Sequence, residues 1–251
     1  MLIDMEPIEY ETMFHREENY WWYVGLHDLV KAQIAAFLRG KKSPRILDAG
    51  CGTGKLLDYC REYKPFGLEY SGEAFKFLSR RKLGNIVRAS ICRIPFADSS
   101  FDLVASMDVI YTVQAPDDLV GLREMSRVLK PGGILLLNLP AYEFLRSHHD
   151  AAVHTRQRYT GGRLRTMLRD VGLTVKTISY RNTMLFPIAA GIRLLQKLSN
   201  PHPDAPSSDL QPLPKPVNWA LTLPLLVENR LIRLGGRLPF GLSVYGVAVK
   251  G

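Results

Sequence analysis

Short apolar runs alternate with longer amphipathic stretches through most of the chain. Between residues 45 and 182 the short runs are continuous, whereas the longer stretches repeat apolar positions about every three to four residues. Continuous runs are typical of strands buried on both faces of a parallel sheet, and the longer repeat is typical of helices that cover such a sheet. The pattern predicts strands over residues 45–50, 65–70, 85–90, 101–110, 134–140, 173–182 and 243–250.

Helices are expected between these strands. The connecting segments predict helices over residues 54–63, 72–82, 117–129 and 161–171. Because strand–helix–strand units are almost always right-handed, their succession predicts an open, doubly wound α/β sheet. The length of 251 residues suits one large α/β domain, or one such domain with an extra lobe.

Two regions depart from this alternation. The pattern of residues 1–43 predicts helices that lie over the sheet. Residues 183–240 are expected to form two apolar helices joined by a Pro-rich linker, at a point where a short hairpin would be enough to connect the last two strands. The expected organisation is an N-terminal helical cap over 1–43, a core over 44–182, a helical insertion over 183–240 and a final core strand over 241–251.

Composition narrows the class of protein. The apolar fraction of 46% is that of an ordinary globular protein, and the sequence has no apolar run of about 18 residues that would span a membrane. The acidic first residues lack a signal pattern, so the expected location is the cytoplasm. Three cysteines without a CxxC pair are expected to be reduced thiols. The net charge of +9 favours an anionic partner: a phosphorylated substrate, an acidic membrane surface or nucleic acid.

A glycine-rich segment carries the strongest chemical signal. "ILDAGCGTG", residues 46–54, is an apolar strand that ends in an acid and leads through three glycines into a helix. Such a turn, at the carboxyl end of a strand, lets a ligand approach the backbone closely. Glu69 follows Gly50 by 19 residues, at the end of the next strand, where a carboxylate can accept both hydroxyls of a ribose.

The same segment resembles motif I of the class I S-adenosylmethionine-dependent methyltransferases. "FGLEYSGEAFKF", "ICRIPFADSSFDLVASMDVI" and "LREMSRVLKPGGILLLNLP" resemble the later motifs of that family. The resemblance implies a Rossmann-like, seven-stranded, mostly parallel sheet flanked by helices, with the last strand antiparallel. It also implies an enzyme that transfers a methyl group from S-adenosyl-L-methionine.

The resemblance assigns a set of cofactor-binding positions. Asp48 and the glycines would hold the methionine end, Glu69 the ribose and Tyr70 the adenine, while the backbone of Met107 would face the amino group. The family usually has Asp where this chain has Ser90, so the adenine contact differs here. The full set is Asp48, Gly50, Cys51, Gly52, Gly54, Glu69, Tyr70, Ser90, Ile91 and Met107.

The acceptor is expected to contact the loops that follow the fourth and fifth strands. Asp108 and Tyr111 are candidate catalytic residues there, although many relatives have Glu-His where this chain has Tyr111 and Thr112. The N-terminal aromatic residues Tyr20, Trp21 and Trp22 form either a wall that stacks on the substrate or ordinary packing of the cap on the sheet.

The stretch "RSHHDAAVHTRQRYT", residues 146–160, allows four interpretations: a metal site, an acid/base site, an anion site or a solvated loop. On a helix, Asp150, His154 and Arg158 would share one face. The preferred hypothesis is acceptor binding without a metal, with His154 and Asp150 handling a proton and Arg156 and Arg158 binding an anion. The further substrate-binding candidates here are His148, His149 and Tyr159. The stretch also resembles a bacterial branch of the family that carries a "PA…HD…H…RRY" pattern.

The insertion has four interpretations. It is a lid over a hydrophobic acceptor, a surface that docks on an anionic membrane, a homodimer interface, or a cover for the sheet edge. The membrane hypothesis uses apolar and basic side chains of the second helix, namely Leu225, Leu226, Leu231, Leu234, Arg230, Arg233 and Arg237. The lid is preferred, with membrane docking second.

The expected substrate is a small molecule, hydrophobic or phosphorylated. Nucleic acid is not expected, because the Asn/Asp-Pro-Pro-aromatic motif that holds a flipped base is replaced by "SMDVIYT". A lipid methyltransferase peripheral to the membrane and a non-catalytic regulator that binds S-adenosylmethionine remain as alternatives.

Overall fold

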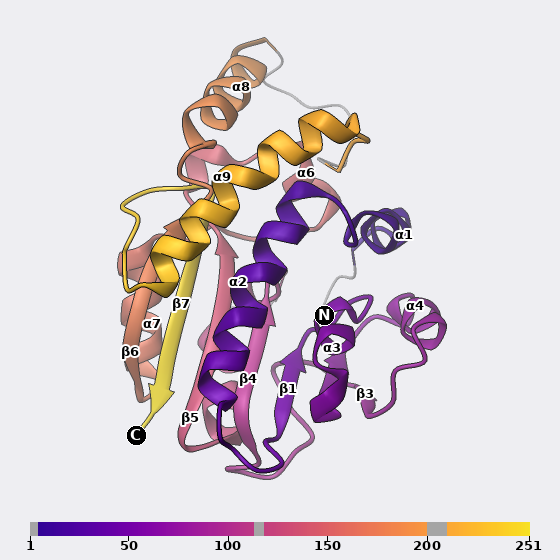
Figure 1. Cartoon of the computed structure of the whole chain (residues 1–251), viewed down its shortest axis with the longest axis vertical. Coiled ribbons are helices and arrows are strands. Elements are labelled where there is room, and N and C mark those ends of the chain that lie inside the picture. Colours follow the sequence, from indigo (N-terminus) through magenta and orange to yellow (C-terminus); the bar gives the residue numbers. More distant parts are fainter. Residues whose placement is uncertain (1–4, 113–117, 200–209) are drawn as a thin grey trace.

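The computed structural model describes residues 5–112, 118–199 and 210–251. The described residues form one seven-stranded sheet with the order β3-β2-β1-β4-β5-β7-β6 (Figure 1). β7 runs antiparallel to both of its neighbours, while the other pairs are parallel. This confirms the expected fold class. The strands are β1 Ile46–Ala49, β2 Phe66–Glu69, β3 Ile86–Arg88, β4 Phe101–Met107, β5 Leu129–Pro140, β6 Leu173–Arg181 and β7 Ser243–Lys250.

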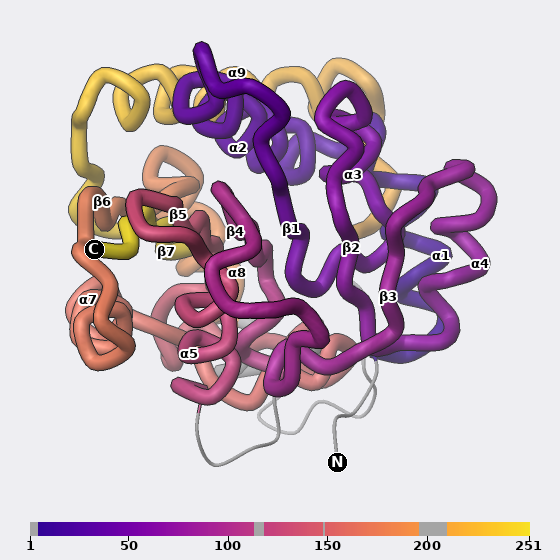
Figure 2. Tube along the Cα trace, turned by 90° about the horizontal axis from the view of Figure 1, so that it is seen from below, coloured from indigo at the N-terminus to yellow at the C-terminus, as the bar shows by residue number. Residues whose placement is uncertain are grey.

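Helices cover both faces of the sheet. In Figure 2, α2 (Trp21–Leu38), α3 (Lys55–Tyr59) and α9 (Lys215–Arg233) lie on one side, and α5 (Asp118–Val128) and α7 (Gly161–Asp170) on the other. Successive residues of β4 face opposite sides of the sheet. Leu103 packs in the hydrophobic cluster beneath α2, and Val104 packs in the cluster beneath α5 and α7. This burial on both faces explains why the strands are continuous apolar runs.

The remaining helices lie around the carboxyl ends of the parallel strands. They are α1 (Pro7–Arg16), α4 (Ala74–Arg80), α6 (His148–Ala152) and α8 (Phe186–Ser199), with short 3₁₀ turns at Arg61–Tyr63, Ile110–Thr112 and Glu143–Leu145. α8 lies at the top of Figure 1, beyond the ends of the strands. No helix in the described part of the chain is long and apolar enough to cross a membrane.

β5 begins earlier than its pattern predicts. The expected strand starts at residue 134, but β5 starts at Leu129 and includes the "KPGG" segment, because Leu129 pairs with Phe101 before the register shifts to Leu103 and Ile134. A glycine pair usually ends an element, and here Gly132, with φ of 73°, instead accommodates the irregularity within the strand.

α9 of the insertion packs along α2 rather than standing apart from the core. Leu225 lies against Gly25, where an added Cβ would be 2.5 Å from its Cδ2 atom. Asn229 Nδ2 donates to the Gly25 carbonyl at 2.7 Å and to Asp28 Oδ2 at 2.9 Å. The helix runs unbroken through Pro224. The expectation that Leu225 faces a membrane is wrong, because this side chain is buried.

Candidate functional site

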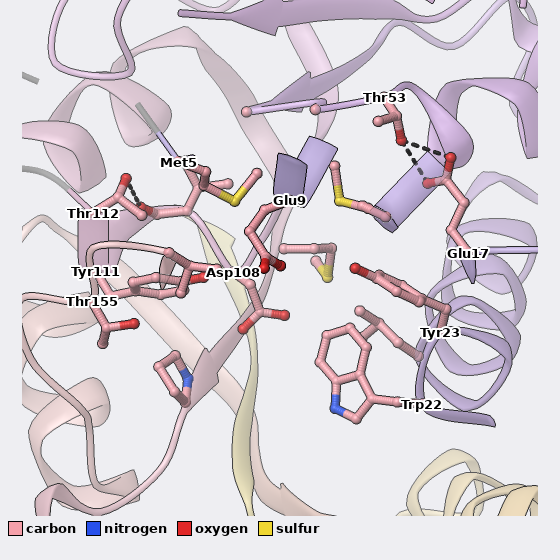
Figure 3. A pocket seen from close by; sticks show the side chains of 18 of the residues that line it. Met5, Glu9, Glu17, Trp22, Tyr23, Thr53, Asp108, Tyr111, Thr112 and Thr155 are labelled. Atoms are coloured by element: carbon pink, nitrogen blue, oxygen red, sulfur yellow. Dashed lines mark hydrogen bonds between the residues drawn. The ribbon is translucent and has the colours of Figure 1, made fainter. Parts of the chain in front are cut away.

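A cavity of about 510 Å³ opens at the carboxyl ends of β1, β2 and β4. Its walls come from the cap, the glycine turn, the loop after β4, α6 and α8. Figure 3 shows Glu9, Tyr23 and Asp108 directing their polar atoms toward its middle. Cavities of this size enclose small molecules in many proteins.

The glycine turn forms one end of the cavity. Gly50 has φ of 92°, and a Cβ there would lie 2.4 Å from Val109 Cγ2. The amides of Gly50 and Cys51 donate to the Leu68 carbonyl at 2.8 and 3.0 Å, which ties the turn to β2. A side chain at Gly50 would both strain the backbone and displace the loop after β4, so the sequence requires glycine.

Glu69 is held by the backbone. Its carboxylate accepts hydrogen bonds from the amides of Gly52 at 2.7 Å, Tyr70 at 2.8 Å and Ser71 at 2.9 Å. Three donors on fixed backbone set the orientation of the carboxylate at the cavity wall. The binding of ribose hydroxyls by Glu69 stays a prediction of the family resemblance.

Asp48 is buried beside the glycine turn. Desolvation, together with the nearby charge of Glu69, raises the pKa of Asp48 to about 8. A positively charged ligand would favour the ionised carboxyl and reverse that rise. The pair of Asp48 and Glu69 therefore fits a cationic nucleoside such as S-adenosylmethionine, which combines a ribose with a sulfonium and an ammonium group.

Asp108 follows β4 in a strained conformation. Its φ is 55°, which non-glycine residues seldom adopt, and such strain is common at functional sites. Burial raises the pKa of Asp108 to about 7, although the Asn138 hydrogen bond and the charges of Arg181 and Arg158 oppose the rise. A carboxyl that titrates near neutral pH in a closed cavity is suited to accept a proton.

A chain of buried polar groups supports Asp108 from behind. Asn138 Nδ2 donates to Asp108 Oδ2 at 2.9 Å, and Arg181 Nη1 donates to Asn138 Oδ1 at 3.2 Å. The Asp108 amide also donates to the Asn138 carbonyl at 2.8 Å. These contacts fix one carboxyl oxygen and leave Oδ1 without a hydrogen-bond partner among the described residues.

Hydrogen bonds and ion pairs that the sequence did not reveal connect the cap to the core beside the cavity. Glu17 accepts from Thr53 Oγ1 at 2.7 Å and from Arg81 Nη2 at 2.6 Å, while Glu18 pairs with Lys55 at 2.5 Å. These bonds join the cap to the turn after β1. Burial raises the pKa of Glu17 despite these partners.

Several cavity residues of the cap were missed by sequence reasoning, whereas the expected aromatic residues Tyr20, Trp21 and Trp22 do line the cavity. The available signal was the occurrence of acids and aromatics at helical spacing inside apolar segments. The cap residues missed are Met5, Glu9, Tyr10, Met13, Glu17, Tyr23, Leu26 and His27.

Most of the expected cofactor positions lie at the cavity wall. Gly54 and Ser90 are not part of the lining, and Ser90 Oγ accepts a hydrogen bond from the Cys92 amide at 3.0 Å. The positions that do line the cavity are Asp48, Gly50, Cys51, Gly52, Glu69, Tyr70, Ile91 and Met107. On the acceptor side, Asp108, Tyr111, His149, Asp150 and Arg158 line it as well.

Asp150 and Arg158 form a buried ion pair. Arg158 Nε and Nη2 donate to the two carboxyl oxygens of Asp150 at 2.9 and 2.8 Å, and Arg158 Nη1 donates to the Ala141 carbonyl at 3.0 Å. Burial alone would raise the pKa of Asp150, but Arg158 more than offsets this and the pKa is lowered. Asp150 also accepts from the Ser147 amide, which caps α6.

The hypothesis of one helix over residues 150–158 is wrong. α6 ends at Ala152, and His154 takes a left-handed conformation with φ of 51°. His154 Nε2 lies 3.5 Å from Glu6 Oε1 rather than beside Asp150, whose carboxyl is bound to Arg158. The left-handed backbone of His154 does not continue a right-handed helix, so Asp150 and Arg158 lie on different segments of the chain.

The two arginines proposed to bind one anion point to different carboxylates. Arg156 Nη2 bonds Asp118 Oδ1 at 2.5 Å, while Arg158 bonds Asp150. Tyr159 is fully buried and its hydroxyl accepts from Gln157 at 2.8 Å. The side chain of His148 lies outside the described residues. Among the described residues, no group of three or more His, Cys, Asp or Glu side chains is arranged to hold a metal ion.

Residues 47–137 match the model of a family described as a methyltransferase domain. The probable tRNA methyltransferase 9B of Mus musculus is 26% identical over 143 residues, which are 56% of this chain and 31% of that protein. A probable S-adenosylmethionine-dependent methyltransferase of Mycolicibacterium smegmatis is 28% identical, over 64% of this chain and 62% of the relative. The chain therefore spans less than a third of the length of the mouse relative.

The fold is shared with solved methyltransferase structures. An S-adenosylmethionine-dependent methyltransferase from Thermotoga maritima superposes with a TM-score of 0.58 at 18% identity, and the match covers 97% of this chain and 95% of the other.

Proposed function

From the premise that this chain is a member of the class I S-adenosylmethionine-dependent methyltransferases, we propose that it methylates a small-molecule acceptor in the described cavity. The single observation that carries the proposal is the cavity itself. It joins the glycine turn and Glu69 at one end to the strained Asp108 and the aromatic cap at the other. Its enclosure by the cap and α8 favours a small molecule over a folded nucleic acid.

The cofactor end would orient the methyl donor through backbone and carboxylates. Glu69 would accept the ribose hydroxyls, Asp48 would attract the positive charge, and the glycine turn would allow close approach of the backbone. When bound, S-adenosylmethionine would supply a methyl group bonded to a positively charged sulfur. The acceptor atom would attack the methyl carbon in line with that bond, and S-adenosylhomocysteine would be the leaving group. The protein contributes alignment and exclusion of water.

Asp108 would remove the proton that the acceptor loses. As the new bond to the methyl carbon forms, the proton passes from the acceptor atom to Oδ1 of the ionised carboxylate. Asn138 holds the other carboxyl oxygen, and Arg181 holds Asn138, so these two act as positioning residues. Tyr111 lies beside Asp108 in Figure 3, and burial raises its pKa well above the usual value, so it remains protonated.

The acceptor is proposed to be at least partly hydrophobic. The wall opposite the glycine turn combines the cap aromatics with Ala189, Ile192 and Arg193 of α8. We infer that the cap and the insertion, residues 1–43 and 183–240, act as covers of this wall, with α8 as the lid. Arg158 is held by Asp150, so an anionic group of the acceptor would meet Arg193 rather than a pair of arginines.

Two measurements test the proposal. Calorimetry with S-adenosylmethionine should detect one site, and protein incubated with methyl-labelled cofactor and cell extract should place the label in small molecules extractable by solvent. Failure of calorimetry to detect binding would overturn the proposal. Label in precipitable RNA would replace the small molecule with a nucleic acid substrate, and binding without labelling of any fraction would favour a regulator.

The Asp108→Asn variant tests the proton acceptor. Loss of this base should lower kcat by about 10²–10⁴-fold while leaving the affinity for S-adenosylmethionine within about twofold, because the change is isosteric. The wild-type rate should rise with pH through the Asp108 pKa of about 7, and the variant should lose that dependence. Equal rates and pH profiles in the two proteins would remove Asp108 from the mechanism.

A further inference from the structure

α9 exposes an apolar face. Its buried face combines the polar residues Thr222, Glu228 and Asn229 with Leu225 and Ile232, while further apolar side chains face outward. A surface helix of a globular protein normally exposes a polar face. The exposed apolar side chains indicate that the outward face has a use of its own.

The outward residues form one continuous stripe. Trp219, Leu223, Val227 and Leu231 recur every fourth residue, and Leu234 follows just beyond the end of α9. Trp219 is 64% exposed and Leu234 is 77% exposed. An apolar stripe of this length differs from the single exposed apolar residues that all proteins carry.

α8 extends the apolar surface toward the cavity. Ile188 and Leu195 are exposed, and Ile192 is both half-exposed and part of the cavity wall. α8 lies at the upper end of Figure 1, and the amino-terminal part of α9 reaches the same end of the molecule. Ile192 joins the exposed face of α8 to the wall of the cavity.

The charges on this surface have one sign. The exposed basic residues Lys215, Arg230 and Arg233 lie on or beside the α9 stripe, with Arg237 just after the helix. α8 and α9 contain a single acidic residue, Glu228, and it is buried, where Oε1 accepts from the Met184 amide at 2.8 Å. The outward face thus combines apolar side chains with positive charge.

We propose that the outward face of α8 and α9 docks on an anionic membrane surface. Apolar side chains with a tryptophan, bordered by arginines, are the features of helices that lie in the interface of acidic lipids. A second copy of this chain fits less well, because a symmetric contact would bring the arginines of two α9 helices together.

The proposal refines the membrane hypothesis from the sequence. Leu225 points into the core and takes no part, whereas Trp219, Leu223 and Val227, which the sequence hypothesis did not include, form the centre of the stripe. Leu231, Leu234 and the arginines keep the place expected for them.

Flotation of the full chain with vesicles tests the docking. Vesicles with about 30% phosphatidylglycerol should carry the protein, neutral phosphatidylcholine vesicles should carry much less, and ~0.5 M NaCl should weaken the binding. Absence of binding to the acidic vesicles would overturn the proposal. The assay needs no acceptor, so it is independent of whether methyl transfer is detected.

Paired variants assign the binding to this face. Trp219→Ser with Leu231→Ser should lower vesicle binding roughly tenfold, whereas Ile8→Ser, which removes an exposed apolar side chain on α1, should not. Arg230→Gln with Arg233→Gln should lower binding to acidic vesicles roughly 20-fold, and the control Arg169→Gln with Lys176→Gln should cause a much smaller loss. All four residues changed on α9 are exposed, so unchanged thermal melting should confirm that the fold is intact.

Two outcomes would contradict the assignment. Equal losses in the α9 variants and their controls would mean that binding follows total charge rather than this surface. A dimer of the wild-type protein in solution that the Trp219→Ser, Leu231→Ser variant converts to a monomer would assign the face to a second copy of the chain.

Discussion

The two ends of the cavity are built by different means. At the cofactor end, backbone groups hold the functional carboxylate, since Glu69 accepts from three amides. At the acceptor end, side chains hold side chains, as in Asp150 with Arg158 and in Asp108 with Asn138 and Arg181. A site built on backbone depends on local chain geometry, whereas a site built on side-chain pairs depends on partners remote in the sequence.

The largest effect is expected at the acceptor end. Arg158→Met would leave the buried carboxylate of Asp150 without its partner and should lower the free energy of unfolding by about 3–5 kcal/mol. Urea denaturation measures this loss. Arg156→Met is the matched control, because Asp118 would keep its bond to Arg163 at 3.0 Å and the loss should be much smaller. If Arg158→Met unfolds at the wild-type urea concentration, the pair has no structural role.

At the cofactor end, a change in the backbone of the glycine turn should weaken cofactor binding. Gly50→Ala places a Cβ against Val109 at a φ of 92° and should weaken S-adenosylmethionine binding by roughly 100-fold. Gly40→Ala is a matched control, since Gly40 has a similar φ of 79° and no atom within 4 Å of an added Cβ. Calorimetry measures the affinity of both variants for S-adenosylmethionine. A loss in Gly50→Ala but not in Gly40→Ala would show that the glycine turn itself is needed for binding. Wild-type affinity in Gly50→Ala would show that the turn tolerates a side chain.

The affinity for the cofactor should depend on pH through Asp48, which lies at the cofactor end of the cavity. Asp48 has a pKa of about 8 in the ligand-free protein, so a cation must displace its proton below that pH. The affinity for S-adenosylmethionine should fall by up to about tenfold per pH unit below pH 8, with proton release on binding measured by calorimetry in two buffers. Asp48→Asn should bind weakly without that slope. A flat profile in the wild type would contradict the assignment.

The same pKa has a consequence for stability. The folded state binds the Asp48 proton more tightly than the unfolded state, whose pKa is near 3.8. This contribution to stability is complete below that pH and is lost as the pH rises to about 8. Asp108, with a pKa of about 7, acts in the same direction, so the ligand-free protein should melt at lower temperature as the pH rises through this window.

The smallest effect is expected for His154. Its side chain faces Glu6 rather than Asp150, so His154→Asn should change the free energy of unfolding by less than about 0.5 kcal/mol and leave kcat and KM within about twofold. Asn tolerates the left-handed backbone of this position. A large drop in kcat with normal melting would restore the proton-handling hypothesis for His154.

The sequence predicted the parts of the molecule that follow from local pattern. The strands, their order of occurrence and the glycine turn were readable because buried parallel strands and positive-φ turns restrict residue types directly. The path of α9 was not predictable to the same degree. Its inward face mixes polar and apolar side chains, and the periodicity of Thr222 to Ile232 does not reveal that Gly25 and Asp28 supply the hydrogen-bond partners of Asn229.

The acceptor end was predicted in composition but not in pairing. The residue types in the 146–160 stretch indicated ion pairs and proton chemistry, but Asp150 could have met His154 or Arg158, and capping of α6 favoured Arg158. Glu9 and Glu17 were missed because the spacing of acids and aromatics in the cap does not by itself distinguish a buried acid from an exposed one.

The bonds between α2 and α9 give the protein a particular order of assembly. Asn218 accepts from the Trp21 amide, and Asn229 donates to the Gly25 carbonyl, across 197 and 204 residues of chain. During synthesis, the hydrogen bonds that support Trp21 and Gly25 cannot form until Asn218 and Asn229 have emerged. Contacts between residues so far apart in the sequence slow folding, and folding intermediates that lack them expose apolar surface. A nascent chain would therefore complete the aromatic wall of the cavity only when α9 has emerged, shortly before β7 enters the sheet between β5 and β6.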